Sequence, residues 1–146
     1  MKIWVCLIGL VGSFFALSAL ADTGLRVYEE GRRQYFSSKN ISNGQAKELG
    51  MRQAASDLRK FLDNFPNHPK APDALFNVGS IFLDLVQLTG DRDAATRSVH
   101  YFKELVAKYP KHRLADDALY QIASICKEVF QDQKCVDDAY RRILGE

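Results

Sequence analysis

Apolar residues recur at helical spacing along most of the chain after residue 21, and no segment alternates apolar and polar residues long enough to form a strand. A polar loop, residues 37–44, interrupts the first part of this pattern. Pro66 and Pro110 interrupt it further on, because the residue before a proline is pushed out of the helical conformation. The sequence therefore predicts an all-α protein with helices over residues 22–38, 45–64, 70–88, 94–109, 114–130 and 136–144.

One segment of the chain occurs twice. Residues 65–80 and 109–124 are offset by 44 residues, and seven pairs of positions within them are identical: Pro66/Pro110, His68/His112, Ala71/Ala115, Asp73/Asp117, Ala74/Ala118, Leu75/Leu119 and Ser80/Ser124. Self-similarity at a fixed period of this size is typical of stacked repeat proteins. A single helical hairpin cannot cover its own apolar face, so we expect three hairpins, about 22–66, 67–110 and 111–146, to stack into a solenoid.

The apolar stripes also predict which side chains hold the hairpins together. On each expected helix, the large apolar residues spaced three or four positions apart share one face. We expect the core to contain Leu58, Phe61, Leu75, Val78, Phe82, Phe102, Leu105, Leu119, Ile122 and Ile125.

The first 21 residues differ in composition from the rest. Lys2 precedes an uncharged apolar run that ends in the small residues Ala19 and Ala21. This arrangement is typical of a secretory signal peptide, which we expect to span residues 1–21 and to be cleaved before Asp22. The alternative is an uncleaved anchor, because the run is about long enough to cross a bilayer. We expect contact with a membrane only through this segment, and only if it is not cleaved.

Charge and motif content exclude several classes of function. The formal net charge is +2 from 20 basic and 18 acidic residues, and no basic stripe stands out, so a nucleic acid partner is not expected. No spacing typical of a catalytic, phosphate-binding or metal-binding set is present. His68 and His112 are a full repeat apart, so we expect each to be solvated or to cap a helix. The sequence predicts no enzyme activity, cofactor or metal.

Two of the three cysteines lie near the end of the chain. Cys126 and Cys135 flank the expected turn near residues 131–133. Residues on either side of a helical turn can face each other, so the pair is a candidate disulfide that would hold the last helix in place. The alternative is one buried and one exposed thiol. A redox-active pair is not expected, because the C-x-x-C spacing is absent.

Several residues resemble those of tetratricopeptide repeats. Asn77 to Gly79 followed by Phe82 resembles the core of the first helix of that repeat, and Phe102 and Pro110 resemble the aromatic and the closing proline of the second. The resemblance implies a right-handed α-α superhelix of about three hairpins over residues 22–146. The period departs from the usual 34 residues, and we expect about ten added residues near positions 86–93. The last expected helix has no closing proline, which leaves open whether it acts as a cap or belongs to a longer protein.

The segment Tyr109–Leu119 looks like bacterial envelope tetratricopeptide proteins. One such group comprises assembly factors that serve the β-barrel assembly machine and the Tol–Pal system. The other is the N-terminal repeat region of secreted N-acetylmuramoyl-L-alanine amidases, which residues 28–39 and 81–85 resemble. The resemblance implies a chain secreted across the inner membrane into the periplasm, where it acts as a scaffold that binds a protein or peptide partner. The alternative is the targeting region of such an amidase, linked to peptidoglycan.

With Gly79 placed at the glycine of the tetratricopeptide motif, the first helix of each hairpin supplies an inner, concave surface. The aromatic residues on this surface, with nearby carboxylates, suit an extended peptide or a partner helix. Alternatively, Phe76 and Tyr120 pack against a neighbouring hairpin, and Asp73 and Asp117 complement a helix dipole. The predicted partner-binding residues are Asp73, Phe76, Ser80, Leu83, Asp84, Asp117, Tyr120, Ser124, Lys127 and Glu128.

Overall fold

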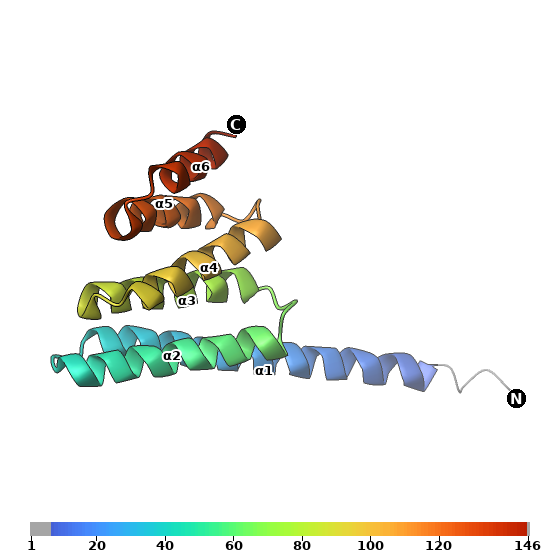
Figure 1. Ribbon diagram of the computed structural model, residues 1–146. Helices are drawn as coiled ribbons and strands as arrows, with labels where there is room; N and C mark the ends of the chain where they lie inside the picture. The colour runs from blue at the N-terminus through green and yellow to red at the C-terminus, as the bar shows by residue number, and fades with distance from the viewer. Residues whose placement is uncertain (1–6, 146) are drawn as a thin grey trace, which may run out of the picture.

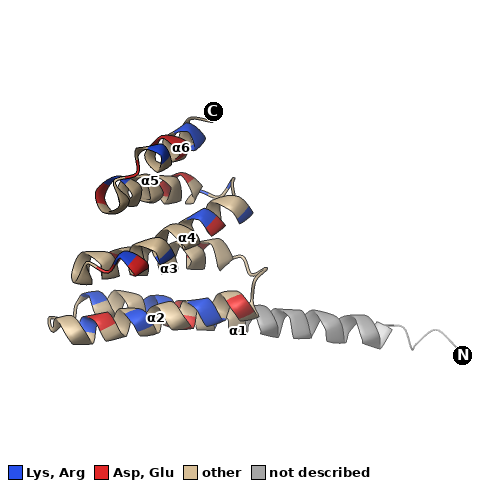
Figure 2. Ribbon diagram, viewed as in Figure 1, with Lys and Arg blue, Asp and Glu red and all other residues tan. Residues whose placement is uncertain are grey.

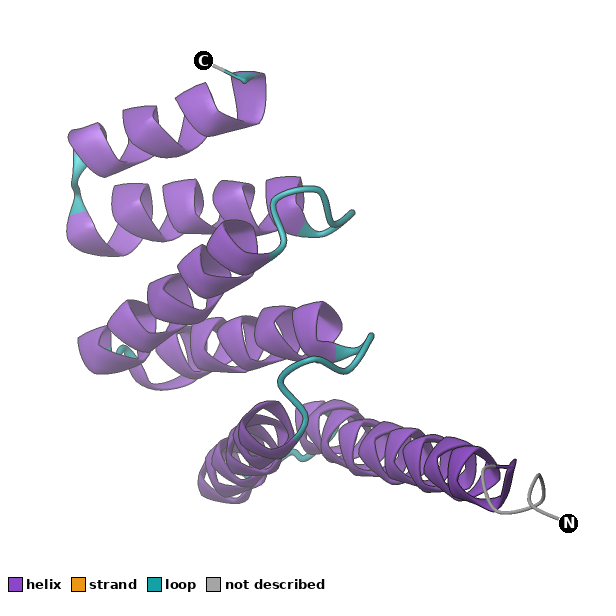
Figure 3. Cartoon of the chain, turned by 90° about the vertical axis from the view of Figure 1, so that its right-hand side faces the viewer, coloured by secondary structure: helices purple, strands orange, loops and turns teal. Residues whose placement is uncertain are grey.

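The computed structural model describes the backbone of residues 7–145 and the side chains of residues 23–145. Over this range the chain forms α-helices joined by short turns, with no strand (Figures 1 and 3). A single π-helical turn, Cys126–Phe130, follows the fifth helix. The helices are α1 (Leu7–Lys39), α2 (Gly44–Asn64), α3 (Ala71–Thr89), α4 (Arg92–Lys108), α5 (Ala115–Ile125) and α6 (Gln133–Leu144).

The hairpins stack in chain order, with α1 and α2 at one end of the molecule and α6 at the other (Figure 1). Each helix packs on the next, and α1 also contacts α3 directly. The contacts of α2 with α3 and of α4 with α5 join successive hairpins into a continuous stack. The predicted all-α, tetratricopeptide-like fold is confirmed.

Local sequence signals explain where the helices begin and end. Asn43 precedes α2, and its side-chain oxygen accepts a hydrogen bond from the backbone N–H of Ala46 at 3.0 Å. Asp91 does the same for the N–H of Asp93 at 2.9 Å, at the start of α4. These bonds satisfy amides that have no partner inside a helix. Gly90 ends α3 in the left-handed region, at φ 73°, which glycine adopts without steric cost.

The core contains the residues that the apolar stripes predict. All ten predicted core side chains are buried, and Phe61 and Phe102 are among the largest that are fully enclosed. Gly79 allows α3 and α4 to approach closely, since a Cβ there would lie 2.7 Å from a ring carbon of Phe102. The buried hydroxyl of Ser98 donates to the carbonyl oxygen of Gly79 at 2.8 Å, which satisfies a polar group that water cannot reach.

Most helix ends lie within two residues of the predicted ones, a difference that is usual at helix ends. Three differences are larger. The first helix begins at Leu7, before the predicted start at residue 22, and α6 begins at Gln133 instead of residue 136. The fifth helix changes to the π-helical turn at Cys126, whose carbonyl oxygen accepts from the N–H of Asp132 at 2.9 Å. At the end of α1, the buried hydroxyl of Ser38 donates to the carbonyl of Tyr35 at 2.6 Å.

The extra length of the repeat does not form an irregular insertion. Only two residues, Gly90 and Asp91, separate α3 from α4. The residues expected to be added near 86–93 therefore lengthen the end of α3 and the start of α4.

The predicted signal peptide, residues 1–21, and its cleavage site at Ala21 and Asp22 lie outside the residues whose side chains are described. Among the described residues, no helix combines the length and the apolar character needed to cross a membrane.

Candidate functional site

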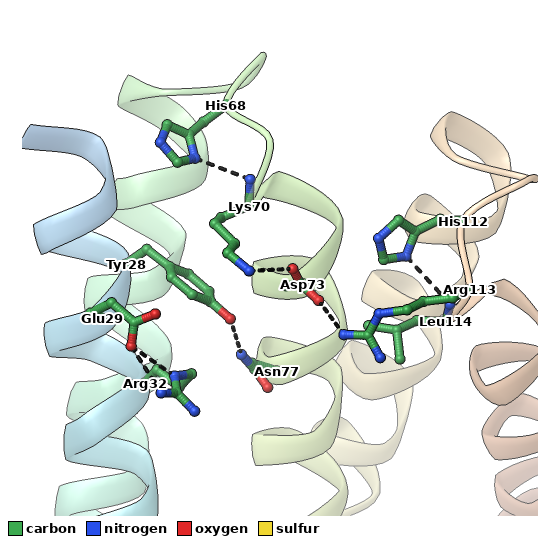
Figure 4. Close-up of polar contacts among 10 residues, drawn as sticks. All are labelled: Tyr28, Glu29, Arg32, His68, Lys70, Asp73, Asn77, His112, Arg113 and Leu114. Atoms are coloured by element: carbon green, nitrogen blue, oxygen red, sulfur yellow. Dashed lines mark hydrogen bonds and ion pairs between the residues drawn. The ribbon is translucent and has the colours of Figure 1, made fainter. Parts of the chain in front are cut away.

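The repeated segment forms the same turn twice. The imidazole Nδ1 of His68 accepts a hydrogen bond from the backbone N–H of Lys70 at 3.0 Å, and His112 accepts from Leu114 at 3.3 Å (Figure 4). In both turns the histidine carbonyl also accepts from the first residue of the next helix. Each histidine thus shapes the entry to α3 or α5. No group of three potential metal ligands was found among the described residues.

Asp73 joins two successive hairpins. Its carboxylate accepts from Lys70 Nζ at 3.3 Å within its own hairpin and from Arg113 Nη2 at 3.0 Å in the turn before α5 (Figure 4). The Asp73 side chain is only 13% exposed. The structure therefore uses this predicted partner-binding residue in an internal contact.

Asp84 makes a comparable contact between α1 and α3. Tyr35 donates its phenolic hydrogen to Asp84 Oδ2 at 2.8 Å, and Lys39 Nζ lies 2.9 Å from the same oxygen. The pKa of Tyr35 is raised far above its usual value. Burial of the ring is the larger cause, and the negative charge of Asp84 is the next. This network leaves Asp84 with little capacity to receive a ligand.

The two predicted aromatic residues differ in exposure. Phe76 is partly buried, and its ring centroid lies 5.4 Å from that of Phe102. Tyr120 occupies the equivalent position one repeat later and is 57% exposed. Phe76 thus packs on Phe102 of its own hairpin, whereas Tyr120 is more than half exposed to solvent.

Tyr28 extends this comparison to the first hairpin. Gly31 lies against Leu58 in the first hairpin, and Gly79 lies against Phe102 in the second. Leu58 and Phe102 are 44 positions apart, which is one repeat, so the two glycines occupy equivalent places. Tyr28, three residues before Gly31, therefore corresponds to Phe76. It is only 4% exposed, and its hydroxyl oxygen accepts from Asn77 Nδ2 at 3.2 Å (Figure 4).

The remaining predicted residues fall into two groups. Ser80 and Leu83 on α3 are partly buried, with Leu83 packed against the core. On the later helix, Asp117, Lys127 and Glu128 are exposed, and the hydroxyl of Ser124 lies 3.4 Å from a carboxylate oxygen of Glu128. The accessible part of the predicted inner surface is therefore on α5 and the π-helical turn.

A disulfide joins Cys126 to Cys135, with Cα atoms 5.9 Å apart. It connects the buried start of the π-helical turn to the first turn of α6. Arg92 strengthens the same corner, because its guanidinium donates to the carbonyl of Val129 at 2.7 Å. The last helix is thus tied to the stack by one covalent bond.

The sequence did not predict which residues bind Asp73 and Asp84 on α3. Arg113 corresponds to Pro69 in the preceding repeat, so comparison of the repeats gave no signal for its contact with Asp73. The pair Tyr35 and Asp84 is 49 residues apart. Helical spacing relates residues three or four positions apart on one helix, so it gave no signal for this pair.

Comparison with known proteins gives one result. A model of the family described as "YfiO: Outer membrane lipoprotein" matches residues 21–141, which is most of the chain. The searches of curated proteins and of solved structures found no match. The matched residues include both copies of the repeated segment and end within α6. The chain belongs to the YfiO family of outer membrane lipoproteins.

Proposed function

We propose that the protein is an exported scaffold that binds a protein partner in the cell envelope and contributes to assembly of the outer membrane. The family match supports the setting, since the family is described as outer membrane lipoproteins. The helical stack supports the mode of action, because stacked hairpins present extended surfaces to partners. The chain acts by docking and carries out no chemistry of its own.

The observation that carries the proposal is the exposure of Tyr120. Its counterparts in the earlier hairpins are covered: the ring of Tyr28 is buried and packs on Phe61, and Phe76 packs on Phe102. At 57% exposure, Tyr120 keeps a large, rigid apolar surface in water. Tyrosine is enriched at the centres of protein interfaces because its ring gives contact area at a small cost in conformational entropy.

The residues around Tyr120 define the proposed docking surface. Asp117 lies one turn before it on α5, and Ser124, Lys127 and Glu128 follow it. Asp73, which is equivalent to Asp117, binds Arg113 of the next hairpin. By analogy, the exposed carboxylate of Asp117 suits an arginine or lysine of the partner.

We further propose that the mature chain is periplasmic and starts at Asp22, as the sequence predicts. Lipid attachment to a protein of the envelope uses a cysteine thiol. The disulfide already occupies Cys126 and Cys135, and Cys6 lies early in the apolar run instead of at its end. The intact mass of protein purified from the envelope tests this proposal. We expect the mass of residues 22–146 with one disulfide, whereas a mass that includes Cys6 or an acyl group would contradict it.

Capture from the native cell tests the scaffold function. The protein would be tagged at its C-terminus and crosslinked in intact cells, and the bound proteins identified by mass spectrometry for the wild type, Tyr120→Ala and the control Lys60→Ala. We expect outer membrane assembly proteins with the wild type and the control, and a clear reduction with Tyr120→Ala.

Recovery of the protein alone would contradict the proposal. Equal recovery with Tyr120→Ala would show that another surface binds the partner. Recovery of muropeptides or division proteins would favour the amidase-related alternative, which no observation on the described residues currently favours.

A further inference from the structure

A second surface lies between the outer helices α2 and α4, apart from Tyr120. It is a hollow of about 470 Å³ lined by Arg59, Phe82, Thr96, Arg97, His100 and Tyr101. A volume of this size accommodates a few side chains of a partner. Basic and aromatic groups dominate the lining. Along the helices, by contrast, Lys and Arg are interspersed with Asp and Glu (Figure 2).

The floor of the hollow is a pair of stacked rings. Phe82 is 4% exposed, and its ring lies parallel to that of Tyr101, with centroids 5.8 Å apart and planes 7° apart. His100 meets the edge of Tyr101 at 5.3 Å. The stack holds both larger rings in place, so that an apolar group entering the hollow meets a fixed surface.

The cationic side chains of the hollow have unused hydrogen-bond donors. The guanidinium of Arg97 lies 5.7 Å from the centre of the Phe82 ring, an arrangement that orients the planar group without using its N–H donors. Arg59 reaches the same hollow from α2. Among residues 23–145, neither arginine forms an ion pair.

Two acids, Glu104 and Asp63, lie near this hollow. Glu104 is bound to Lys108 at 2.6 Å, which offsets its charge, and lies 3.8 Å from His100. The charge of Asp63 acts to raise the pKa of Tyr101, whereas the charges of Arg59 and Arg97 act to lower it. Neither acid forms an ion pair with the guanidinium group of Arg59 or Arg97.

We propose that this hollow, the α2–α4 pocket, binds an acidic peptide segment of a partner protein, with carboxylates on Arg59 and Arg97 and an apolar side chain on Phe82 and Tyr101. Guanidinium groups pair with carboxylates through two parallel hydrogen bonds, which a pre-oriented Arg97 can offer at low entropic cost. A lipid surface is a poorer match, because recognition of anionic membranes uses clusters of roughly four to eight basic residues.

Fluorescence anisotropy tests the proposal with the mature, disulfide-bonded chain. The probe is a fluorescein-labelled peptide, Gly-Glu-Glu-Phe-Glu-Glu, compared with its counterpart in which lysine replaces each glutamate. We expect the acidic peptide to bind and the basic peptide not to bind. Arg97→Gln and Arg59→Gln should each weaken binding about fivefold, the effect of losing one partly exposed charge pair.

Two controls separate the pocket from general charge effects. Lys111→Gln removes the same charge from an exposed loop and should leave the affinity unchanged. Tyr120→Ala should also leave it unchanged, so that failure of this proposal and failure of the scaffold proposal are distinguishable. All four variants alter exposed side chains, and thermal unfolding would confirm that each is folded.

Three results would overturn the proposal. One is equal affinity for the acidic and basic peptides, and another is no change in the two arginine variants. The third is binding of phosphatidylglycerol vesicles through Arg59 and Arg97 without binding of the acidic peptide, which would assign the pocket to a membrane surface.

Discussion

Gly79 on α3 faces the ring of Phe102 on α4 so closely that a Cβ at position 79 would lie 2.7 to 2.9 Å from three carbons of that ring. Phe102 is fully buried and cannot move aside without disturbing its neighbours. The contact sets the distance between the two helices of the central hairpin. Because Gly31 faces Leu58 in the same manner, the spacing is a repeated feature of the stack.

Gly79→Ala should therefore destabilise the protein. The added methyl group enters a filled core, and overpacking of this kind costs roughly 1–3 kcal/mol. Gly44→Ala is the matched control, since nothing lies within 4 Å of a Cβ at the start of α2. The control should be neutral or stabilising by up to about 1 kcal/mol. Urea unfolding measures both, and equal free energies of unfolding for the two variants would refute the close contact.

Phe102→Ala should lower the free energy of unfolding by about 3–5 kcal/mol, because it removes a fully buried aromatic ring and leaves a cavity. Tyr120→Ala should change it by no more than about 0.5 kcal/mol, since Tyr120 is largely exposed. Thermal unfolding of the two variants provides the comparison. A stable Phe102→Ala protein would show that the core is wrongly assigned.

The contact between Tyr35 and Asp84 should make stability depend on pH in the alkaline range. Burial and the charge of Asp84 raise the pKa of Tyr35 above its value of about 10 in the unfolded chain. The hydroxyl of Tyr35 therefore ionises less readily in the folded state than in the unfolded chain. Its contribution to the free energy of unfolding is complete below pH 10 and declines as the pH rises further.

Tyr35→Phe should remove part of that decline. At pH 8 we expect it to cost about 1–2 kcal/mol, for the lost hydrogen bond to a carboxylate. The difference in free energy of unfolding between the variant and the wild type should be smaller at pH 10.5 than at pH 8. Urea unfolding at both pH values measures it. Some decline remains in the variant, because burial also raises the pKa of Tyr28 and Tyr101. A difference independent of pH would count against the network, and Tyr120→Phe serves as the exposed control.

Reduction of the disulfide should loosen α6 more than the rest of the stack. By the chain-entropy model, closing a loop of this size contributes about 2–3 kcal/mol. Hydrogen exchange with and without reductant should show faster exchange in α6 and little change in α2. In the double variant Cys126→Ala, Cys135→Ala, exchange should not respond to reductant. Alkylation of both thiols under non-reducing, denaturing conditions would show that the bridge is absent in solution.

Much of the fold could be predicted from local sequence. Helical spacing identified the buried stripes, and the prolines at 66 and 110 fixed the ends of α2 and α4, because these features act over a few residues. The repeat itself showed that hairpins must stack. The π-helical turn after Ile125 could not be predicted in this way, because no short-range pattern distinguishes it from a continuing α-helix.

The candidate site was less accessible to sequence reasoning. Spacing placed Asp73 and Asp84 on the first helix of a hairpin, but Arg113 and Tyr35, which bind them, come from other hairpins. Which side chains meet across hairpins depends on how the helices tilt against each other, and that tilt is set by packing over the whole stack. The same reasoning could not tell that Phe76 would be covered and Tyr120 left exposed.

The most direct test of the scaffold function is site-specific photocrosslinking in living cells. A photoreactive amino acid would replace Tyr120 in one strain and Lys60, which is exposed on α2, in another. We expect a discrete crosslink to an outer membrane assembly protein from position 120 and none from position 60. The absence of any crosslink from position 120, or the same crosslink from both positions, would contradict the proposal that the exposed face of α5 docks the partner.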